Sequence, residues 1–585
     1  MLLRQPFVGR VVARTRAQSA RIGTLLADTA VLLGVFALLI TTAQIGAGAF
    51  VHFHPPMDVP SVSLDWRYLP YYAVRSTLRM FIALGASLLF TLVYGYVAAK
   101  SRNAERVLIP LLDILQSVPV LGFLSVTVTG FIALFPGRLL GLEMASLFAI
   151  FTSQVWNMTF SFYQSLKTLP RDLEETVTLY RLPRWQRFTR LELPAAMLGL
   201  LWNAMMSFGG GWFFVAASEA ISVLNKNYTL PGIGSYVATA VAAQNLPALL
   251  AALVTIAVVI LTVDQLFWRP LVAWADKFKL ERSASAEPAY SWMLAILRRS
   301  RLPRLIAQLL DPVSDAIGNQ VARLLPMRPQ QNPGQTKTAL VDQLYNGALV
   351  VIVLGAALRG FAFIDNAVST TEMMHTLFMA LATLGRVILL TLISTLLWVP
   401  LGVAIGFNPR LARLVQPVVQ FLASFPANFL FPFATLFFIR AGISLNVGSI
   451  LLMALGAQWY ILFNTIAGAM SIPNDLREMA RNLGLRGWQR WRALIIPGIF
   501  SAWVTGGITA MGGAWNASIV SELVTWGNTT LTAYGIGAYI ARATTSGDWP
   551  RIVLGVGLMS IFVVGLNRLL WRRLYQLAET KYKLG

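Results

Sequence analysis

The sequence predicts an all-α membrane protein in which twelve transmembrane helices form two parallel six-helix repeats. Its 585 residues are 56% hydrophobic and only 12% charged, whereas soluble domains carry about 25% charged residues. Twelve apolar runs are each long enough to cross a bilayer. A block of residues in the first half recurs in the second half 303 positions later. Together these observations exclude a soluble globular protein and indicate a duplicated membrane domain.

The expected spans lie at about 26–50, 73–99, 110–135, 142–166, 194–221, 246–268, 340–362, 376–406, 414–439, 447–470, 497–524 and 549–571. A helix rises about 1.5 Å per residue, so each run can cross a hydrocarbon core of roughly 30 Å. The chain divides into a tail at 1–25, a first six-span domain at 26–272, a linker at 273–337 and a second six-span domain at 338–585. Because each domain has an even number of spans, an axis along the membrane normal is expected to relate them.

The positive charge is distributed unevenly along the chain. The net charge is +22, and most of the 47 Lys and Arg fall in the N-terminal tail, the even-numbered loops and the C-terminal tail. By the positive-inside rule, both termini are expected in the cytoplasm of a bacterium, with the chain in its inner membrane. The charge therefore reflects topology and contact with anionic membrane lipid, and no nucleic-acid partner is expected.

The linker carries a pattern of its own. Between positions 292 and 309, apolar residues alternate with four arginines. This pattern predicts a basic amphipathic helix that lies on the membrane surface, and the alternative is a regulatory arm. No metal site is expected anywhere in the chain, because it has no cysteine and its three histidines are His52, His54 and His375.

The duplication is clearest around a polar, arginine-rich segment, which runs from Leu169 to Pro194 and again from Ile472 to Pro497. At the same offset of 303, Trp156, Gly209, Gly210, Trp212, Ser218, Glu219, Gly232, Gly234 and Tyr236 match Trp459, Gly512, Gly513, Trp515, Ser521, Glu522, Gly535, Gly537 and Tyr539. Upstream the offset becomes 307, where Arg79, Gly95, Pro110 and Pro119 match Arg386, Gly402, Pro417 and Pro426.

Each polar segment predicts a compact helix–turn–helix. In the second copy a helix opens after Pro473, Gly484 suits a turn because glycine readily adopts positive φ, and a short second helix starts near Trp488. Pro497 is expected to stop that helix before the next span. The apolar residues and arginines of such a segment could fit a groove on a partner protein.

The spacing of Glu478, Ala480, Gly484 and Pro497 resembles the EAA loop in the membrane subunits of ABC importers. The resemblance implies a type I importer with the MetI-like permease fold. It also implies that two copies of a cytoplasmic ABC ATPase dock on the loops, and that a solute-binding protein delivers the solute outside. The residues expected to dock the ATPases are Asp172, Glu175, Arg181, Trp185, Pro194, Asp475, Glu478, Ala480, Gly484, Trp488 and Pro497.

The first copy departs from the family pattern, because Arg181 stands in place of the glycine and Thr176 and Val177 replace the small residues. Its turn is expected to be strained or differently shaped, or else to dock normally in spite of the divergence. The chain has no G-x-x-x-x-G-K-[ST] phosphate loop. It is therefore expected to be a transport subunit without its own ATPase site or cofactor, with ATP and Mg²⁺ bound by the partner ATPase.

The stretch from Trp515 to Glu522 and the start of the eighth span, Thr383 to Arg386, look like the permeases for nitrate, sulfonates, taurine and bicarbonate. The resemblance implies two such subunits fused into one chain that carries a small anion. The alternatives are a fused permease for iron(III) or thiamine, a twelve-span secondary transporter and, last, a membrane enzyme. A secondary transporter needs ionisable coupling residues in mid-membrane, and these are scarce in this sequence. A membrane enzyme needs clustered His, Cys or Asp near a membrane surface, and the sequence lacks them. These two alternatives are therefore less favoured.

Four of the charged residues within the expected spans are expected to pair, because a charge in hydrocarbon costs at least about 2.5 kcal/mol on insertion scales and requires a partner. Their similar depth predicts the pairs Arg79 with Glu219 and Arg386 with Glu522. Each pair either locks helices together or acts as a gate at the outer vestibule. The polar and aromatic residues that could line the pathway, or pack between helices, are Gln154, Asn157, Asn203, Trp212, Gln458, Tyr460, Asn464 and Trp515.

Overall fold

The computed structural model describes residues 25–33, 61–117, 120–180, 182, 184–223, 226–278, 291–302 and 357–581, with isolated positions between 303 and 356. Most of the expected first and seventh spans, the linker and the N-terminal tail therefore lie outside the described residues, as do residues 582–585. Part of the linker is described as the helix α12 (Trp292–Arg299).

The first repeat contains α2 (Leu69–Lys100), α3 (Arg102–Ser117), α4 (Leu124–Leu134), α5 (Leu140–Lys167), α6 (Arg171–Leu179), α7 (Arg184–Arg187), α8 (Leu193–Glu219), α9 (Ile233–Ala242), α10 (Leu246–Val263) and α11 (Arg269–Ala275). The second repeat contains α15 (Thr370–Gly406), α16 (Pro409–Ser424), α17 (Phe431–Ala441), α18 (Leu445–Ser471), α19 (Asn474–Asn482), α20 (Gly487–Arg490), α21 (Ile496–Ser521), α22 (Ile536–Ser546), α23 (Trp549–Leu566) and α24 (Arg572–Lys581). The order of elements is thus the same in both halves.

Among the described residues, seven helices are long and apolar enough to cross a membrane. They are Trp66–Lys100, Trp185–Glu219, Leu246–Ala275, Thr370–Gly406, Leu445–Ser471, Gly487–Ser521 and Trp549–Ala578. The chain is therefore a multi-pass membrane protein. The expected fourth span is present as the continuous helix α5, but α5 is not among these seven.

The third and ninth expected spans are interrupted, which corrects the prediction of a single helix at each. α3 and α4 are separated by a 3-10 turn at Val120–Phe123, and α16 and α17 by a 3-10 turn at Ala427–Phe429. The break in the second repeat begins at Phe425, whose backbone is extended with φ −73° and ψ 128°. The next residue, Pro426, has no N–H and disfavours a helical conformation in the residue before it, which explains the break.

Two short hairpins were not predicted and qualify the all-α fold class. β1 (Ala220–Val223) pairs with β2 (Lys226–Thr229), and β3 (Leu523–Trp526) pairs with β4 (Thr529–Thr532), both antiparallel. Each hairpin directly follows the helix that ends at or beside a buried glutamate. α8 starts beside the α6–α7 segment and ends at the first hairpin, so these features mark opposite ends of the bundle.

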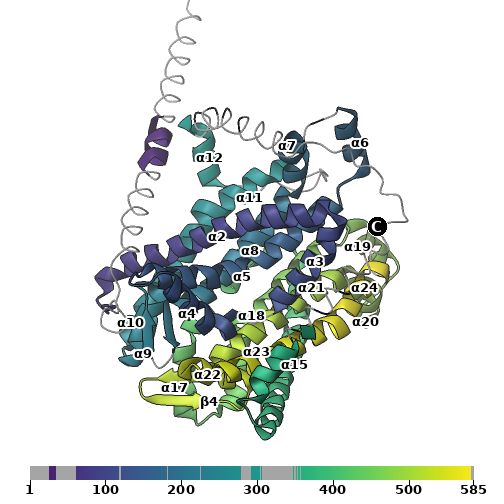
Figure 1. Cartoon of the computed structure of the whole chain (residues 1–585). Coiled ribbons are helices and arrows are strands. Elements are labelled where there is room, and N and C mark those ends of the chain that lie inside the picture. Colours follow the sequence, from purple (N-terminus) through teal and green to yellow (C-terminus); the bar gives the residue numbers. More distant parts are fainter. Residues whose placement is uncertain are drawn as a thin grey trace, which may run out of the picture.

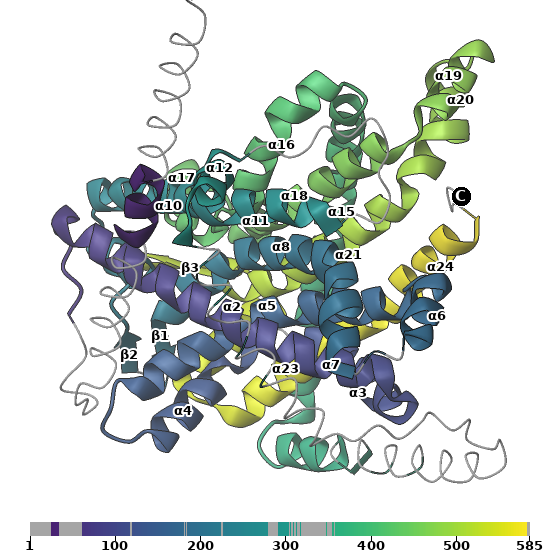
Figure 2. The same cartoon turned by 90° about the horizontal axis from the view of Figure 1, so that it is seen from above.

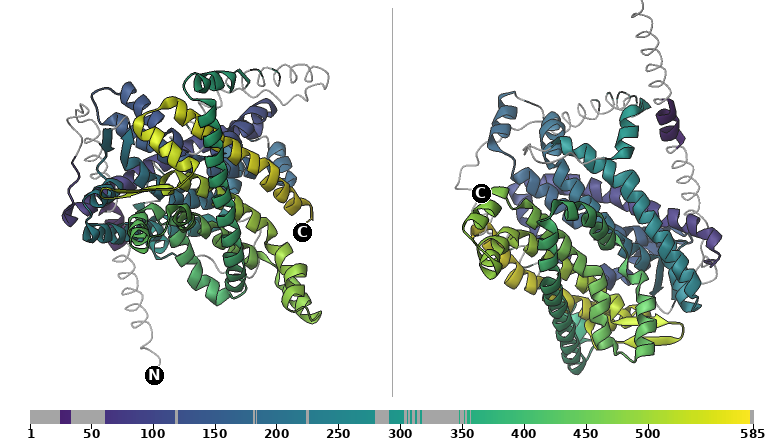
Figure 3. Two further views of the ribbon diagram at one scale, coloured as in Figure 1. Left: turned by 90° about the horizontal axis from the view of Figure 1, so that it is seen from below. Right: turned by 180° about the vertical axis from the view of Figure 1, so that it is seen from behind.

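We call these ends the loop end, with α6, α7, α19 and α20, and the hairpin end, with the strands. Figure 2 shows both helical loops on one side of the bundle and β1, β2 and β3 on the other. In each repeat the core is formed by the same helices, with α5 packed between α2 and α8 and α18 packed between α15 and α21. Figures 1 and 3 show the first repeat, in purple to teal, packed along the second, in green to yellow.

The two hydrophobic cores exchange residues between the repeats. The core of the first repeat includes Phe429 and Trp526 from the second half. The core of the second repeat includes Val120, Ile221 and Leu230 from the first half. The broken spans and the hairpins therefore cross between the repeats, so each half contributes to the core of the other.

Candidate functional site

The second polar segment folds as a helix–turn–helix at the loop end of the bundle. The turn between α19 and α20 contains Gly484 with φ +65° and Gly487 with φ +50°. The Leu485 N–H donates to the Ala480 carbonyl at 3.0 Å. A left-handed residue followed by this hydrogen bond is a Schellman cap, which is why glycine suits position 484.

The first polar segment closes in the same way, although its sequence diverges. The Leu182 N–H donates to the Val177 carbonyl at 3.3 Å, and these residues match Leu485 and Ala480. Arg181 itself lies outside the described residues. The divergent copy thus keeps the helix–turn–helix, with α6 and α7 in the positions of α19 and α20.

Each loop exposes large apolar side chains. Their exposed fractions are 83% for Leu179, 75% for Tyr180, 52% for Met479, 67% for Leu483 and 71% for Trp488. The acidic residues Asp172, Glu175, Asp475 and Glu478 are exposed as well, whereas Trp185 is half-buried against Phe188. Ala480 is only 2% exposed, in a small apolar cluster with Ile472 and Leu494. Each loop therefore combines an anchored inner face with an exposed outer face.

The second helix of each loop does not stop at the proline, which corrects the prediction made from the sequence. One helix runs continuously from Trp185 to Glu219, and its counterpart from Gly487 to Ser521, each 35 residues long. A π-helical turn precedes each proline, at Phe188–Glu192 and at Trp491–Ile495. Such a turn widens the backbone, so Pro194 and Pro497 fit without ending the helix.

The base of the first loop is fastened by ion pairs. Glu192, which is buried, lies 2.6 Å from Lys100 Nζ and 2.8 Å from Arg187 Nε through its Oε1 atom. Arg187 also pairs with Glu174 at 2.8 Å. This chain of charges connects the end of α2 with both helices of the first loop.

The base of the second loop is fastened by a different chemistry. Phe407 stands where Lys100 stands in the first repeat, and the guanidinium groups of Arg477 and Arg490 lie 4.6 and 5.1 Å from its ring centroid. Arg477 also donates to the Ala469 carbonyl at 2.7 Å. Burial, and repulsion by Arg490, hold the pKa of Arg477 below its usual value. Cation–π contacts here replace the ion pairs of the first loop.

At the hairpin end, Arg79 and Glu219 form a buried ion pair, as their sequence positions predicted. Arg79 Nη1 lies 2.6 Å from Glu219 Oε1. Ser76 donates to the same oxygen at 2.6 Å, and the Gly234 N–H donates to Oε2 at 2.7 Å. Glu219 is fully buried. Its carboxylate thus joins α2, α8 and the start of α9.

The second repeat contains the equivalent cluster. Arg386 Nη1 lies 2.7 Å from Glu522 Oε1, which also accepts a hydrogen bond from Thr383 at 2.7 Å. The Gly537 N–H donates to Glu522 Oε2 at 2.8 Å. Arg386 is held further by Asn446, whose Oδ1 accepts from Nη2 at 3.0 Å. The carboxylate of Glu522 therefore connects α15, α22 and the end of α21.

Glu143 was missed by the sequence analysis, although it completes the first cluster. It lies 2.7 Å from Arg75 and 2.6 Å from Arg79. In the second repeat the residues that match Glu143 and Arg75 are Asn446 and Ala382. The extra acid and the extra base therefore occur together, so both clusters are electrically neutral. That paired difference between the halves is the signal that could have revealed Glu143.

The repeated glycines of the hairpin end are explained by close approach. A Cβ atom added at Gly232 would overlap the carboxylate of Glu219, and one added at Gly535 would overlap that of Glu522. Gly232 and Gly535 have extended backbones, with φ of −178° and −167°, that any residue can adopt. The requirement for glycine is therefore steric, since the backbone lies against the buried acid.

We expect Gly535→Ala to destabilise the protein by about 1–3 kcal/mol, because the added methyl group must displace the Glu522 carboxylate from its hydrogen bonds. Gly385→Ala is the matched control, because nothing lies within 4 Å of a Cβ at Gly385 on α15. Thermal unfolding of the two purified variants in detergent measures the difference. Equal stability of both variants would contradict the close approach.

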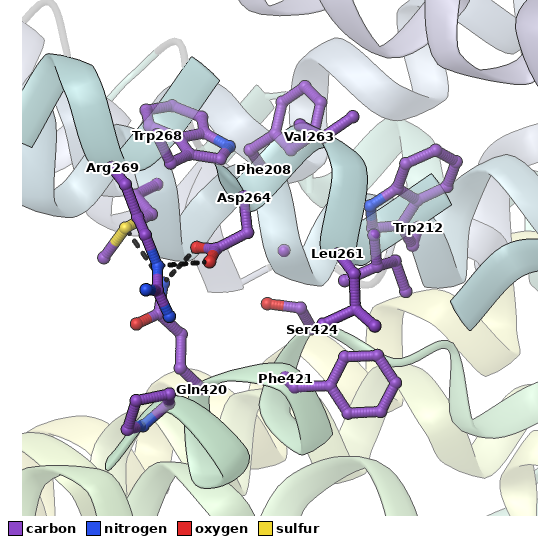
Figure 4. Close-up of a pocket in the computed structure, with 14 residues that line it drawn as sticks. Phe208, Trp212, Leu261, Val263, Asp264, Trp268, Arg269, Gln420, Phe421 and Ser424 are labelled. Carbon is purple, nitrogen blue, oxygen red and sulfur yellow. Dashed lines mark hydrogen bonds and ion pairs between the residues drawn. The ribbon is translucent and has the colours of Figure 1, made fainter. Parts of the chain in front are cut away.

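Between the repeats lies a pocket of about 510 Å³, including the part open to solvent. It is formed by α8 and α10 of the first repeat and α16 of the second, with Trp212 and Phe208 on one side and Phe421 on the other. Figure 4 shows the Asp264 carboxylate facing the side chains of Arg269 and Gln420. Asp264 lies 2.9 Å from Arg269 Nε and accepts from Gln420 at 3.2 Å.

The structure brings only some of the expected pathway residues to this interface. Trp212 lines the pocket, and Tyr460 lines a smaller one beside it. The other expected pathway residues lie elsewhere. Gln154 is buried next to Gly211, and Trp515 is 1% exposed. Asn157 accepts from Gln116 at 3.1 Å and Gln458 accepts from Trp398 at 2.9 Å, while Asn203 and Asn464 donate to the carbonyls of Gly199 and Tyr460 in their own helices, at 3.0 and 2.8 Å.

Each broken span binds the central part of the other repeat. The Val120 N–H donates to Asn516 Oδ1 at 3.0 Å, and Asn428 donates to the Phe213 carbonyl at 3.1 Å. Phe213 and Asn516 occupy matching positions, 303 residues apart. The two halves thus hold each other at equivalent points near the interface.

Comparison with known proteins agrees with this duplicated architecture. The family described as "Binding-protein-dependent transport system inner membrane component" matches the chain twice, at residues 91–267 and 398–583. A nitrate import permease protein of Leptolyngbya laminosa is 27% identical over 188 residues, which are 32% of this chain and 64% of the relative. A bicarbonate transport system permease protein of Synechococcus elongatus is 28% identical over 186 residues, or 32% and 63%.

A putative aliphatic sulfonates transport permease protein of Bacillus subtilis is 28% identical over 185 residues, which are 30% of this chain and 63% of the relative. The chain therefore spans somewhat less than two thirds of the length of these relatives.

Proposed function

The chain belongs to the family of binding-protein-dependent transport system inner membrane components, and from this premise we propose that it forms the whole translocation pathway of an ABC importer. Family membership and the two matched regions support a fusion of two permease domains. In this proposal the pathway runs along the interface between the repeats, past Trp212 and Tyr460. The chain carries no ATPase site, and ATP with Mg²⁺ is bound by separate subunits.

The observation that carries the proposal is the pair of continuous helices from the loop end to the hairpin end. At about 1.5 Å per residue, each 35-residue helix is roughly 50 Å long. Its first turns belong to an exposed loop, and its last residues lie at or beside a buried glutamate that contacts α2 or α15. A displacement of the loop therefore moves a rigid rod that ends at the opposite side of the bundle.

Two copies of an ABC ATPase are proposed to bind the loops, at 171–190 and 474–492. The exposed Leu483 and Trp488 suit an apolar groove on the ATPase, and the exposed Glu478 suits polar contacts at its rim. Closure of the ATPase pair would then push both rods together and switch the pathway between its inward-facing and outward-facing states. Both loops are needed to transmit the movement of the ATPases, because each long helix begins at its own loop.

The loop end is proposed to face the cytoplasm, together with both termini, in the inner membrane of a bacterium. The excess of Lys and Arg in the tails and even-numbered loops supports this orientation. The hairpin end would then face outward and receive an extracytoplasmic solute-binding protein. Basic residues at the loop end would contact anionic lipid headgroups.

The solute is proposed to be a small anion such as nitrate, bicarbonate or a sulfonate. The similar proteins are permeases for nitrate, bicarbonate and aliphatic sulfonates, which supports this substrate class over iron(III) or thiamine. The binding protein would deliver the anion.

Reconstitution tests the proposal directly. The chain, its ATPase and its binding protein are placed in proteoliposomes, and uptake of labelled nitrate, bicarbonate and ethanesulfonate is measured with ATP and with a non-hydrolysable analogue. We expect one of the three anions to accumulate only with ATP and only with the binding protein present. If no ATPase co-purifies with the chain, or if uptake proceeds without ATP, the proposed function is wrong.

A further inference from the structure

The hairpins connect the two repeats at the hairpin end. β1 of the first repeat contacts α22 of the second, and β3 of the second contacts α9 of the first. Trp526, the last residue of β3, is buried in the core of the first repeat. Opening the bundle at this end therefore requires these crossed contacts to separate.

One residue beside the crossing has an unusual backbone. Gln244 follows α9 with φ +53°, and among the described residues it is the only one other than glycine with positive φ. Its counterpart 303 positions later is Gly547, with φ +72°. Both positions end a helix with the same hydrogen bond, from the Asn245 N–H to Ala240 and from the Asp548 N–H to Ala543, each 2.9 Å long.

A glycine would therefore serve position 244 without strain, as it does at 547. Strained conformations persist where the surroundings hold them, and they cluster at switch regions. The glutamine side chain must be explained by what it touches, because Gln244 is exposed and contributes nothing to a core.

The Gln244 side chain lies against the turn of the other repeat's hairpin. A Cβ atom added at Gly527, in the β3–β4 turn, would overlap the Gln244 amide and lie 2.8 Å from its Cγ atom. The Gly527 N–H also donates to the Val241 carbonyl at 3.3 Å. Gly527 has φ +56°, so the hairpin turn is itself built on a left-handed glycine. Two left-handed residues from different repeats thus meet at one point.

We propose that Gln244 and Gly527 form a latch that holds the hairpin end closed and must separate in each transport cycle. The matching position in the second repeat is Gly547, which has no side chain that could make the same contact. The proposal rests on the proposed function for the idea of a cycle, while the contact itself stands on geometry. Separation of β3 from α9 at this latch would open the interface between the repeats toward the outside.

A disulfide tests the latch, and the natural chain has no cysteine to interfere. In Gln244→Cys/Gly527→Cys the Sγ at 244 takes the place of Cγ, which lies 2.8 Å from an added Cβ at 527 and so within disulfide reach. A protease site inserted between residues 279 and 290 reports the cross-link, because the two fragments then stay joined after cleavage. Copper phenanthroline is the oxidant and dithiothreitol the reductant.

We expect the oxidised double variant to lose ATP-driven uptake of the anion probes nitrate, bicarbonate and ethanesulfonate, and to recover it on reduction. The two single-cysteine variants, treated identically, are expected to keep uptake. A fully cross-linked protein that transports at the parent rate would overturn the latch, and so would failure of the cross-link to form. A parent protein that takes up none of the three anions would instead overturn the proposed function. The yield of the cross-link would still show whether residues 244 and 527 are in contact.

Two substitutions distinguish the effect of losing the side-chain contact from the effect of relieving the backbone strain at position 244. Gln244→Ala removes the side chain but keeps the strained backbone, whereas Gln244→Gly removes both. If the latch restrains opening, both variants should raise the ATPase activity that occurs without binding protein, to a similar extent. If only Gln244→Gly changes that activity, the effect comes from strain and the latch is wrong.

Discussion

Glu522→Gln is expected to destabilise the second repeat by about 3–5 kcal/mol, because it leaves the buried Arg386 without a carboxylate. Among the described residues, Arg386 would keep only neutral acceptors, which are the side chain and carbonyl of Asn446 and the Tyr534 carbonyl. In either orientation, the NH2 group of the glutamine amide would also face a donor, either the Arg386 guanidinium or the Gly537 N–H. Thermal unfolding of the purified variant, together with its yield from the membrane, measures the loss.

Glu219→Gln is expected to have a smaller effect in the first repeat. Arg79 would still pair with Glu143, to which it donates two hydrogen bonds at 2.6 and 2.8 Å. Glu372→Gln is the exposed control, because the Glu372–Arg551 pair is 27% and 38% exposed. Ion pairs that reach solvent contribute about 1 kcal/mol or less. The expected order of destabilisation is therefore Glu522, then Glu219, then Glu372.

The same variants distinguish the two roles considered for the buried pairs. A lock between helices predicts that loss of stability and loss of transport occur together. A Glu522→Gln protein that assembles and melts like the parent, yet fails in uptake, would show instead that the pair is a gate. The neutral balance of both clusters and their links to four helices each favour the lock.

Ala480→Asp is expected to abolish docking at the second loop. Ala480 is 2% exposed and packs with Ile472, Leu494 and Ile495. The side chains packed around Ala480 in this cluster are apolar, and burial of a charge among them costs several kcal/mol. This cluster is small and separate from the two main cores, so we expect the loop to lose its shape while the bundle stays folded.

Asn482→Asp provides the matched control, because it adds the same charge on the same helix at an exposed position. Co-purification of the ATPase with the chain, and ATPase activity of the complex, measure docking, while size-exclusion chromatography measures folding. We expect Ala480→Asp to lose ATPase activity and Asn482→Asp to keep most of it. Full activity in both variants would exclude the second loop as a docking site.

Much of the architecture could be predicted because it depends on local sequence patterns. Apolar runs located the helices, matches at offsets of 303 and 307 located the duplication, and Pro473 and Gly484 located the second helix–turn–helix. The pairs Arg79–Glu219 and Arg386–Glu522 could be predicted as well, because a charge inside an apolar helix needs an opposite charge at the same depth.

Other features escaped prediction because their causes are not local. Proline was expected to end a helix at 497, but a π-helical turn absorbs it, whereas Pro426 does interrupt the ninth span. The hairpins follow buried glutamates and are held by contacts with the opposite repeat. Their short sequences therefore show no alternation of apolar and polar residues that would predict them. Glu143 lies near the start of its helix, where an acidic residue needs no special explanation until Arg75 and Arg79 are placed beside it.

The sequence by itself determined that this chain crosses a membrane repeatedly, that it is built twice, and that each half carries a polar loop before a long apolar helix. Only the tertiary structure decided that loop and helix form one rod, that the halves exchange hairpins, and that their loops are fastened by ion pairs in one repeat and by cation–π contacts in the other. The physical reason is that composition and spacing fix how a segment meets water or lipid. Contacts between segments hundreds of residues apart depend instead on how the finished helices pack.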